Sequence, residues 1–140
     1  MLNNLDRLRA DHVEILIIIA EIQHLLQPPT VRMKAEIVQE LVLELTRRTL
    51  SHLLLEDKCL YQEMLISTHD ETRALAQRHV VSTGSMAGHL RDYVKEWTSQ
   101  EKIISCPEHF CDESRHVLEL LQLRINREEH ILYPKAESVS

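Results

Sequence analysis

A histidine and a glutamate stand four residues apart in the stretch SHLLLEDKCLY at residues 51–61. On an α-helix this spacing places His52 and Glu56 on the same face, about one turn from each other. The residues before them continue this face as a mainly apolar stripe at steps of three or four: Val38, Leu41, Leu45 and Thr49. A buried carboxylate is costly unless it is paired or bound to a metal. We therefore expect the rest of the chain to supply partners.

The apolar periodicity predicts four helices, at about residues 4–27, 30–64, 71–97 and 107–133. Prolines 28 and 29 and Pro134 mark helix ends, and the polar stretches 67–71 and 98–107 read as connections. Asn3 or Asn4 is the expected N-cap of the first helix. With only two glycines in 140 residues, the predicted fold is all-α. We expect one domain over 1–140, an antiparallel up-and-down four-helix bundle with its core at about 4–134.

Each predicted helix carries at least one polar residue in its inward stripe. These are His12, His52, Glu56, His79 and Glu128. Three imidazoles and two carboxylates from facing helices are a typical ligand set for one or two transition-metal ions, with iron, manganese or zinc as candidates. Two structural interpretations stand beside this one. Each histidine can be a hydrogen-bonded core residue, and His52 with Glu56 can form a simple pair within one helix.

Charge and composition exclude several classes of protein. The formal net charge of −6 and the lack of a basic stripe argue against a nucleic-acid binder. The apolar run at residues 15–20 is far too short to span a membrane, and the mixed charges at the start do not resemble a signal peptide. Three cysteines do not form a secreted disulfide framework. We therefore expect a cytoplasmic protein without membrane or nucleic-acid partners.

Three motifs make the chain resemble the hemerythrin-like, or HHE cation-binding, domains: RADH at 9–12, HLLLEDKCLY at 52–61 and RINREEHILYP at 124–134. The resemblance covers about residues 5–134. It implies a four-helix bundle with a non-haem di-iron centre. Carried over by position, the implied ligands are His12, His52, Glu56 and Glu128, with His79 from the third helix. His89 is the alternative to His79.

One position departs from that family pattern. The family usually has a histidine four residues before the fourth-helix glutamate, where this chain has Arg124. Arginine stays protonated and offers no lone pair to a metal. Arg124 can instead pair with Glu56 or Glu128. The outcomes left open are a di-metal site with an open position, a single-metal site, and a metal-free bundle closed by an Arg–Glu salt bridge.

The leading functional hypothesis is an iron-binding protein that binds or senses a small diatomic or anionic ligand (O2, NO or peroxide), handles iron, or responds to oxidative or nitrosative stress. A metal-free interaction or signalling module is the alternative, and peroxidase or oxidase activity is a third possibility. Tyr61 and Tyr133 are expected to close the ends of the bundle, with hydroxyls available as hydrogen-bond donors to the ligand residues. The oligomeric state is left open.

Several other residues of chemical interest have no predicted role. Cys106 and Cys111 flank His109, but the C-x4-C spacing is unusual for zinc. Residues 82–88, which include Gly84 and Gly88, indicate a kink or a surface for close helix packing. Cys59 reads as a small core residue. Four histidines share no clear face and are expected at the surface: His24, His69, His116 and His130.

Overall fold

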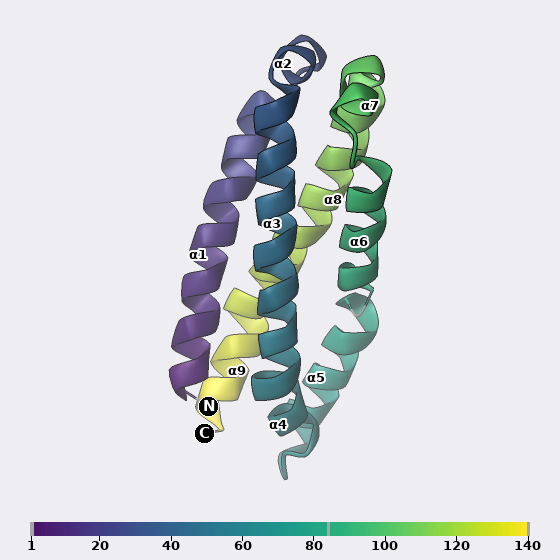
Figure 1. Ribbon diagram of the computed structural model, residues 1–140. Coiled ribbons are helices and arrows are strands. Elements are labelled where there is room, and N and C mark those ends of the chain that lie inside the picture. The colour runs from purple at the N-terminus through teal and green to yellow at the C-terminus, as the bar shows by residue number, and fades with distance from the viewer. Residues whose placement is uncertain (1, 84, 140) are drawn as a thin grey trace.

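The computed structural model of the chain describes residues 2–83 and 85–139, and all its regular elements are helical (Figure 1). The α-helices are α1 (Leu2–Leu25), α2 (Pro28–Met33), α3 (Ala35–Glu56), α4 (Gln62–Leu65), α5 (Asp70–Thr83), α6 (Met86–Glu96), α7 (Gln100–Ser105), α8 (Pro107–Arg127) and α9 (Tyr133–Ser138). Two π-helical turns join α3 to α4 and α8 to α9: η1 (Asp57–Tyr61) and η2 (Glu128–Leu132). The all-α prediction is thus confirmed.

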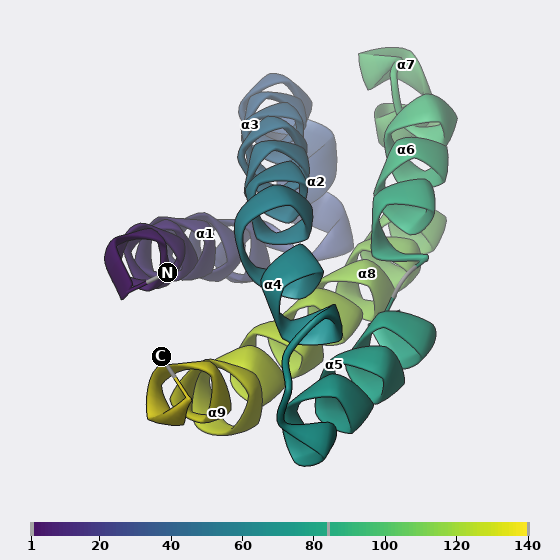
Figure 2. The same ribbon diagram turned by 90° about the horizontal axis from the view of Figure 1, so that it is seen from below.

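The long helices lie side by side and enclose a common core (Figure 1, Figure 2). Helix α1 contacts α3 and α8, and α6 also contacts α3 and α8. The helical segments therefore close into a bundle. Within the described ranges, no helix combines the length and apolarity needed to cross a membrane.

The first half of the chain is more divided than its periodicity predicts. Helix α1 begins at Leu2, ahead of the predicted caps Asn3 and Asn4. Pro28 opens the short helix α2, since a proline without an N–H is well suited to the first turn of a helix. The backbone bends at Lys34 (φ −118°, ψ 32°) before α3 begins. The single helix expected at 30–64 is therefore α2, α3, η1 and α4 in succession.

The second half also departs from the predicted boundaries. The expected kink in 82–88 corresponds to the end of α5 and the start of α6. Gly84 lies outside the described residues. A Cβ built on Gly88 meets nothing within 4 Å, so close helix packing at Gly88 was a wrong prediction. The expected linker 98–107 contains α7, whose first turn is capped by the Ser99 side chain accepting from the Lys102 backbone N–H.

The last helix does not end at Pro134. It continues through η2 into α9, which reaches Ser138 and buries Ala136 completely. Ile131 follows the buried Glu128 by three residues, as an inward position of an α-helix would, but it is 54% exposed, while Leu132 and Tyr133 are buried. A π turn contains more residues than an α turn. It therefore moves the inward face from Ile131 to the following residues.

The apolar core consists of two clusters. The larger one runs along α1, α3, α6 and α8. The smaller one gathers Leu5 and Leu8 with residues of η1, α4, α5, η2 and α9. Buried polar side chains lie between the two. In α1, for example, His12 stands between Leu8 of the smaller cluster and Ile15 of the larger. The helices thus position a polar layer inside an otherwise apolar bundle.

Candidate metal centre

The polar layer is built from residues of every part of the bundle. His12 comes from α1, His52 and Glu56 from α3, His79 from α5, and Glu128 from η2. All five side chains are buried, Glu56 and Glu128 completely. Tyr61, Arg124 and Tyr133 are buried beside them. All members of the leading predicted ligand set thus lie on inward faces.

Four of these residues come close enough to share one ion. Donor atoms of His12, His52, Glu56 and Glu128 all lie within 4.8 Å of one another. His12 Nε2 is 2.9 Å from Glu128 Oε1, and His52 Nε2 is 3.4 Å from Glu56 Oε2. The two carboxylates and the two inward-facing imidazole nitrogens thus form one compact donor set.

His79 lies at the edge of this set. Its Nε2 is 3.5 Å from Glu128 Oε2, and its ring stacks on that of Tyr61 at 5.8 Å between centroids. It also lines a surface pocket of about 270 Å³ together with Leu75, Arg78, Arg127, Ile131 and Leu132. His89, the alternative third-helix residue, is exposed and lines a different pocket beside α8. Between the two, His79 is the one that contacts the buried layer.

The two π turns bring a tyrosine to each glutamate. Glu56 directly precedes η1, which ends at Tyr61, and η2 begins at Glu128 and is followed by Tyr133. Each tyrosine is hydrogen-bonded to the glutamate of the other π turn. The Tyr133 hydroxyl donates to Glu56 Oε2 at 2.6 Å, and the Tyr61 hydroxyl donates to Glu128 Oε2 at 3.0 Å.

The outward nitrogens of the two histidines face carboxylates nearer the surface. His52 Nδ1 is hydrogen-bonded to Asp11 Oδ2 at 3.1 Å, and His12 Nδ1 lies 3.4 Å from Glu129 Oε1. A carboxylate behind an imidazole fixes its ring orientation and its tautomer, and this is the usual support of a metal-binding histidine. Asp11 and Glu129 are not predicted site residues, because they lie beside the apolar stripes. Their one signal in the sequence is adjacency to His12 and Glu128.

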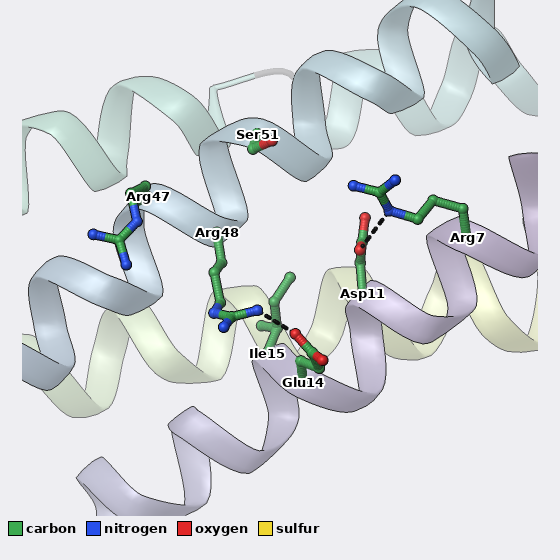
Figure 3. A pocket seen from close by; sticks show the side chains of 7 residues that line it. All are labelled: Arg7, Asp11, Glu14, Ile15, Arg47, Arg48 and Ser51. Atoms are coloured by element: carbon green, nitrogen blue, oxygen red, sulfur yellow. Dashed lines mark hydrogen bonds and ion pairs between the residues drawn. The ribbon is translucent and has the colours of Figure 1, made fainter.

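Asp11 also connects the buried layer to the surface. It lines a pocket of about 360 Å³ between α1 and α3 (Figure 3). In this pocket Arg7 Nε pairs with Asp11 Oδ1 at 3.2 Å, and Arg48 pairs with Glu14. The Arg47 guanidinium points away from these pairs. The Asp11 carboxylate thus contacts buried His52 through one oxygen and solvent-exposed Arg7 through the other.

Arg124 bridges the two buried glutamates. Its Nη2 donates to Glu56 Oε1 at 3.1 Å, and its Nε lies 3.3 Å from Glu128 Oε2. Burial lowers the pKa of Arg124, but the charges of Glu128 and Glu56 outweigh this effect and raise it above its ordinary value. The guanidinium is therefore a permanent positive charge inside the layer, paired with both glutamates.

The pKa values of the two glutamates are shifted in opposite directions, and that of His52 is raised. Burial alone would lower the pKa of His52, but its hydrogen bonds to Glu128 and Glu56 raise that pKa to about 10. Burial, and then the charge of Glu128, raise the pKa of Glu56. Burial opposes ionisation of Glu128 as well, but hydrogen bonds with Glu56 and three histidines hold its pKa well below the usual range. Without a metal, the layer is thus balanced by a proton on His52 and by Arg124.

The hydrogen bonding of the two His12 ring nitrogens shows whether a metal ion fits this arrangement. When its Nε2–H donates to Glu128, Nδ1 is left without a hydrogen bond among the described residues, although it is buried beside Glu129. If Nε2 gave its lone pair to a metal, the proton would move to Nδ1 and face that carboxylate. Together with neutral imidazole and carboxylate donors, which suit iron, manganese and zinc, this makes the cluster a fitting site.

A helical bundle with a buried layer of histidines and glutamates has the construction of a metal-binding bundle. The chain belongs to the hemerythrin family, because the hemerythrin HHE cation-binding domain model matches residues 3–136. The resemblance noted in the three sequence motifs is thus confirmed. No curated protein and no solved structure matches the chain. Family membership suggests metal binding, typically of iron, and the buried cluster can hold a metal ion.

Proposed function

We propose that the protein binds iron at the buried cluster, through His12, His52, Glu56 and Glu128, with His79 at the edge of the cluster beside Glu128. The observation that carries this proposal is the orientation of two imidazoles, whose Nε2 atoms face two carboxylates while their Nδ1 atoms face Asp11 and Glu129. Bound iron would supply a redox-active centre for a small ligand such as O2, NO or peroxide. Zinc or manganese has the same donor preferences and is the alternative metal.

We further propose that the cluster holds one ion rather than two. Arg124 contacts Oε1 of Glu56 and Oε2 of Glu128. This leaves Glu56 Oε2 and Glu128 Oε1 on the side of the two histidine Nε2 atoms. The guanidinium thus occupies the part of the cluster where the family pattern has a further histidine, and its positive charge opposes a second cation.

The pocket beside His79 supports access of a small ligand to the centre. Leu75, Ile131 and Leu132 line it together with Arg78, Arg127 and His79, and His79 lies next to Glu128. Positive charge at this pocket and at Arg124 favours small anions such as peroxide. The role we propose is therefore binding or sensing of such a ligand, or iron handling, in the response to oxidative or nitrosative stress. Peroxide turnover by iron-loaded protein that is lost in Glu56→Ala would instead indicate an enzyme.

A second candidate function has its own supporting observation. All four carboxylate oxygens of Glu56 and Glu128 already have partners within the protein: Arg124, Tyr133, His12 and Tyr61. Such a layer can close without a metal, as buried ion pairs with complete hydrogen bonding do. On this alternative the chain is a metal-free bundle that acts as an interaction or signalling module.

Metal content separates the two candidates. We expect protein produced in iron-supplemented medium to contain about one equivalent of iron by mass spectrometry. His52→Gln should lose the metal while circular dichroism shows an intact helical fold. His116→Gln, an exposed histidine of α8, is the matched control and should retain it. Wild-type protein without any transition metal would favour the metal-free module.

The broader setting is part of the same proposal. We infer one domain over residues 1–140 and a four-helix, antiparallel arrangement, which is supported by the alternating course of α1, α3, α5–α6 and α8 (Figure 1). The three cysteines form no disulfide, which supports a reducing cytoplasm. The net charge of −6 supports the absence of nucleic-acid partners.

A further inference from the structure

A second group of potential metal ligands lies on the surface between α6 and α8, apart from the buried layer. Donor atoms of Glu96, His109 and Glu113 all lie within 4.8 Å of one another. Glu96 ends α6, and the other two residues stand one turn apart in the first half of α8. His109 Nε2 is 3.4 Å from Glu113 Oε2. The group therefore brings one imidazole and two carboxylates together from two helices.

A buried tryptophan holds part of this group in place. Trp97 Nε1 donates to Glu113 Oε2 at 2.6 Å, and the Trp97 ring lies 5.4 Å from that of His109. The indole itself is 2% exposed and packs edge-on against Phe110. Because the indole is fixed in the core, it restricts the carboxylate and the imidazole that contact it. Trp97 thus restrains Glu113 and His109.

The surroundings attract positive charge. A pocket of about 280 Å³ adjoins the group and is lined by His89, Asp92, Tyr93, Glu96, Glu113 and Val117. Lys102 Nζ already lies at the group, 2.6 Å from Glu96 Oε1 and 5.1 Å from the centre of the Trp97 ring. The hydrogen bond and charge of Lys102 lower the pKa of Glu96 below its usual range. An ammonium group therefore occupies a position that a metal cation can take over.

We propose that Glu96, His109 and Glu113 form a second site, which binds a divalent transition-metal ion such as zinc or copper. Imidazole together with carboxylate suits both ions. Because His109 is 62% exposed, water completes the coordination and the ion exchanges with solvent. Lys102 leaves Glu96 when the ion binds. The pocket with His89 and Asp92 then provides the approach to the site.

This site is remote from the buried cluster. The Gln39 side chain donates to the carbonyl of Thr98, which follows Trp97, and Gln39 precedes His52 by thirteen residues in α3. At 1.5 Å per residue, the two sites are about 20 Å apart along the bundle. Binding at the surface site is therefore independent of the proposed iron centre.

Trp97 is the one tryptophan of the chain and reports directly on the site. We would titrate the full-length protein with Cu2+ and follow Trp97 fluorescence, and measure Zn2+ binding in parallel by equilibrium dialysis. Copper bound beside the indole should quench its emission saturably. His109→Ala should weaken the binding of both ions by about tenfold or more, the scale on which even supporting residues of metal sites act. Lys102→Met should strengthen it, because the competing ammonium group is gone.

His116→Ala is the matched control, since His116 is an exposed histidine on the same helix. It should leave the quenching curve unchanged, and none of the three variants should change the iron content of the buried cluster. The proposal is overturned if His109→Ala and wild-type protein give the same curves, or if Lys102→Met fails to strengthen binding. Wild-type protein that contains no iron would refute the proposed buried centre, but it would not contradict the proposal of this surface site.

Discussion

Tyr133 and Glu56 are joined by a 2.6 Å hydrogen bond across the centre of the bundle, from α9 to the last residue of α3. The same Tyr133 oxygen lies 3.3 Å from His12 Nε2 and 3.5 Å from His52 Nε2. One hydroxyl thus contacts three of the four residues that we propose as ligands. Burial raises its pKa far above the usual value, so without a metal the hydroxyl is a proton donor and Glu56 its acceptor.

We predict that Tyr133→Phe destabilises the metal-free protein by about 1.5–3 kcal/mol, the range for a hydrogen bond to a charged group. Urea unfolding after chelator treatment measures this change. Tyr93→Phe is the matched control, because it removes a buried hydrogen bond to the neutral Ser114 hydroxyl, for which about 1 kcal/mol is expected. If Tyr133→Phe lowers the free energy of unfolding no more than Tyr93→Phe does, the hydrogen bond to Glu56 stabilises the protein no more than a neutral one.

Arg124→Leu should destabilise the metal-free protein more strongly, by about 3–5 kcal/mol, because it leaves two buried carboxylates without their guanidinium partner. The same unfolding measurement applies. Arg48→Leu serves as the control. Arg48 pairs with Glu14 and Glu44 at the surface, where such pairs contribute about 0–1 kcal/mol. Equal effects of the two substitutions would contradict a structural role of the Arg124 bridge.

Arg124→His tests the proposed stoichiometry. Replacing the guanidinium with an imidazole removes a fixed positive charge and restores a donor at the position where the family pattern has histidine. We predict that the variant binds about two iron ions where the wild-type chain binds about one. Metal analysis against protein concentration gives the ratio. A wild-type ratio near two, or an unchanged ratio in the variant, would show that Arg124 does not limit the number of ions.

Asp11→Asn should weaken iron binding by about 10–100-fold, because it removes the carboxylate that orients His52 through Nδ1. Competition with a chelator of known affinity measures the change. Glu14→Gln lies in the same pocket (Figure 3), but its ion-pair partner is Arg48 rather than a proposed ligand. It should leave the affinity unchanged. Equal losses in the two variants would indicate a general effect of charge in the pocket.

The pKa of His52 predicts how the stability of the metal-free protein depends on pH. Folding raises this pKa from 6.5 to about 10, so the folded state holds the proton more tightly. The stabilisation is therefore complete below about pH 6.5 and is lost as the pH rises to about 10, with each tenfold difference in proton affinity worth about 1.4 kcal/mol. Glu56, whose pKa is also raised, acts in the same direction.

Unfolding free energies measured across this pH range test that expectation. His52→Gln should flatten the profile, because the glutamine side chain does not titrate. A wild-type stability that stays constant or rises over the range would show that His52 is not held protonated.

Helical periodicity was sufficient to place the predicted ligands on inward faces. His12, His52, Glu56, His79 and Glu128 repeat with the apolar residues around them, and a period of 3.6 is a strong signal in long helices. The exposed positions of His24, His69, His116 and His130 are likewise confirmed. What the pattern could not supply is the partner behind each ligand. Asp11 and Glu129 contact the histidines from neighbouring faces, and a stripe of apolar residues carries no information about those faces.

The π turns are the other feature beyond the reach of the pattern. A constant α-helical period places Ile131 on the same face as Glu128, whereas the structure leaves this residue exposed. The similarity between LLLEDKCLY and NREEHILYP was visible in the sequence. Its structural meaning lies in the fold, which places a π turn beside each glutamate and joins each tyrosine to the glutamate of the other turn.

The most direct test of the central claim is an anomalous-scattering map of crystals of the iron-loaded protein, with data collected on both sides of the iron absorption edge. We predict one peak inside the bundle, within bonding distance of Glu56 and Glu128 and of the Nε2 atoms of His12 and His52. Absence of a peak there, with Arg124 still bridging the two glutamates, would contradict the account and leave the cluster as a metal-free polar layer.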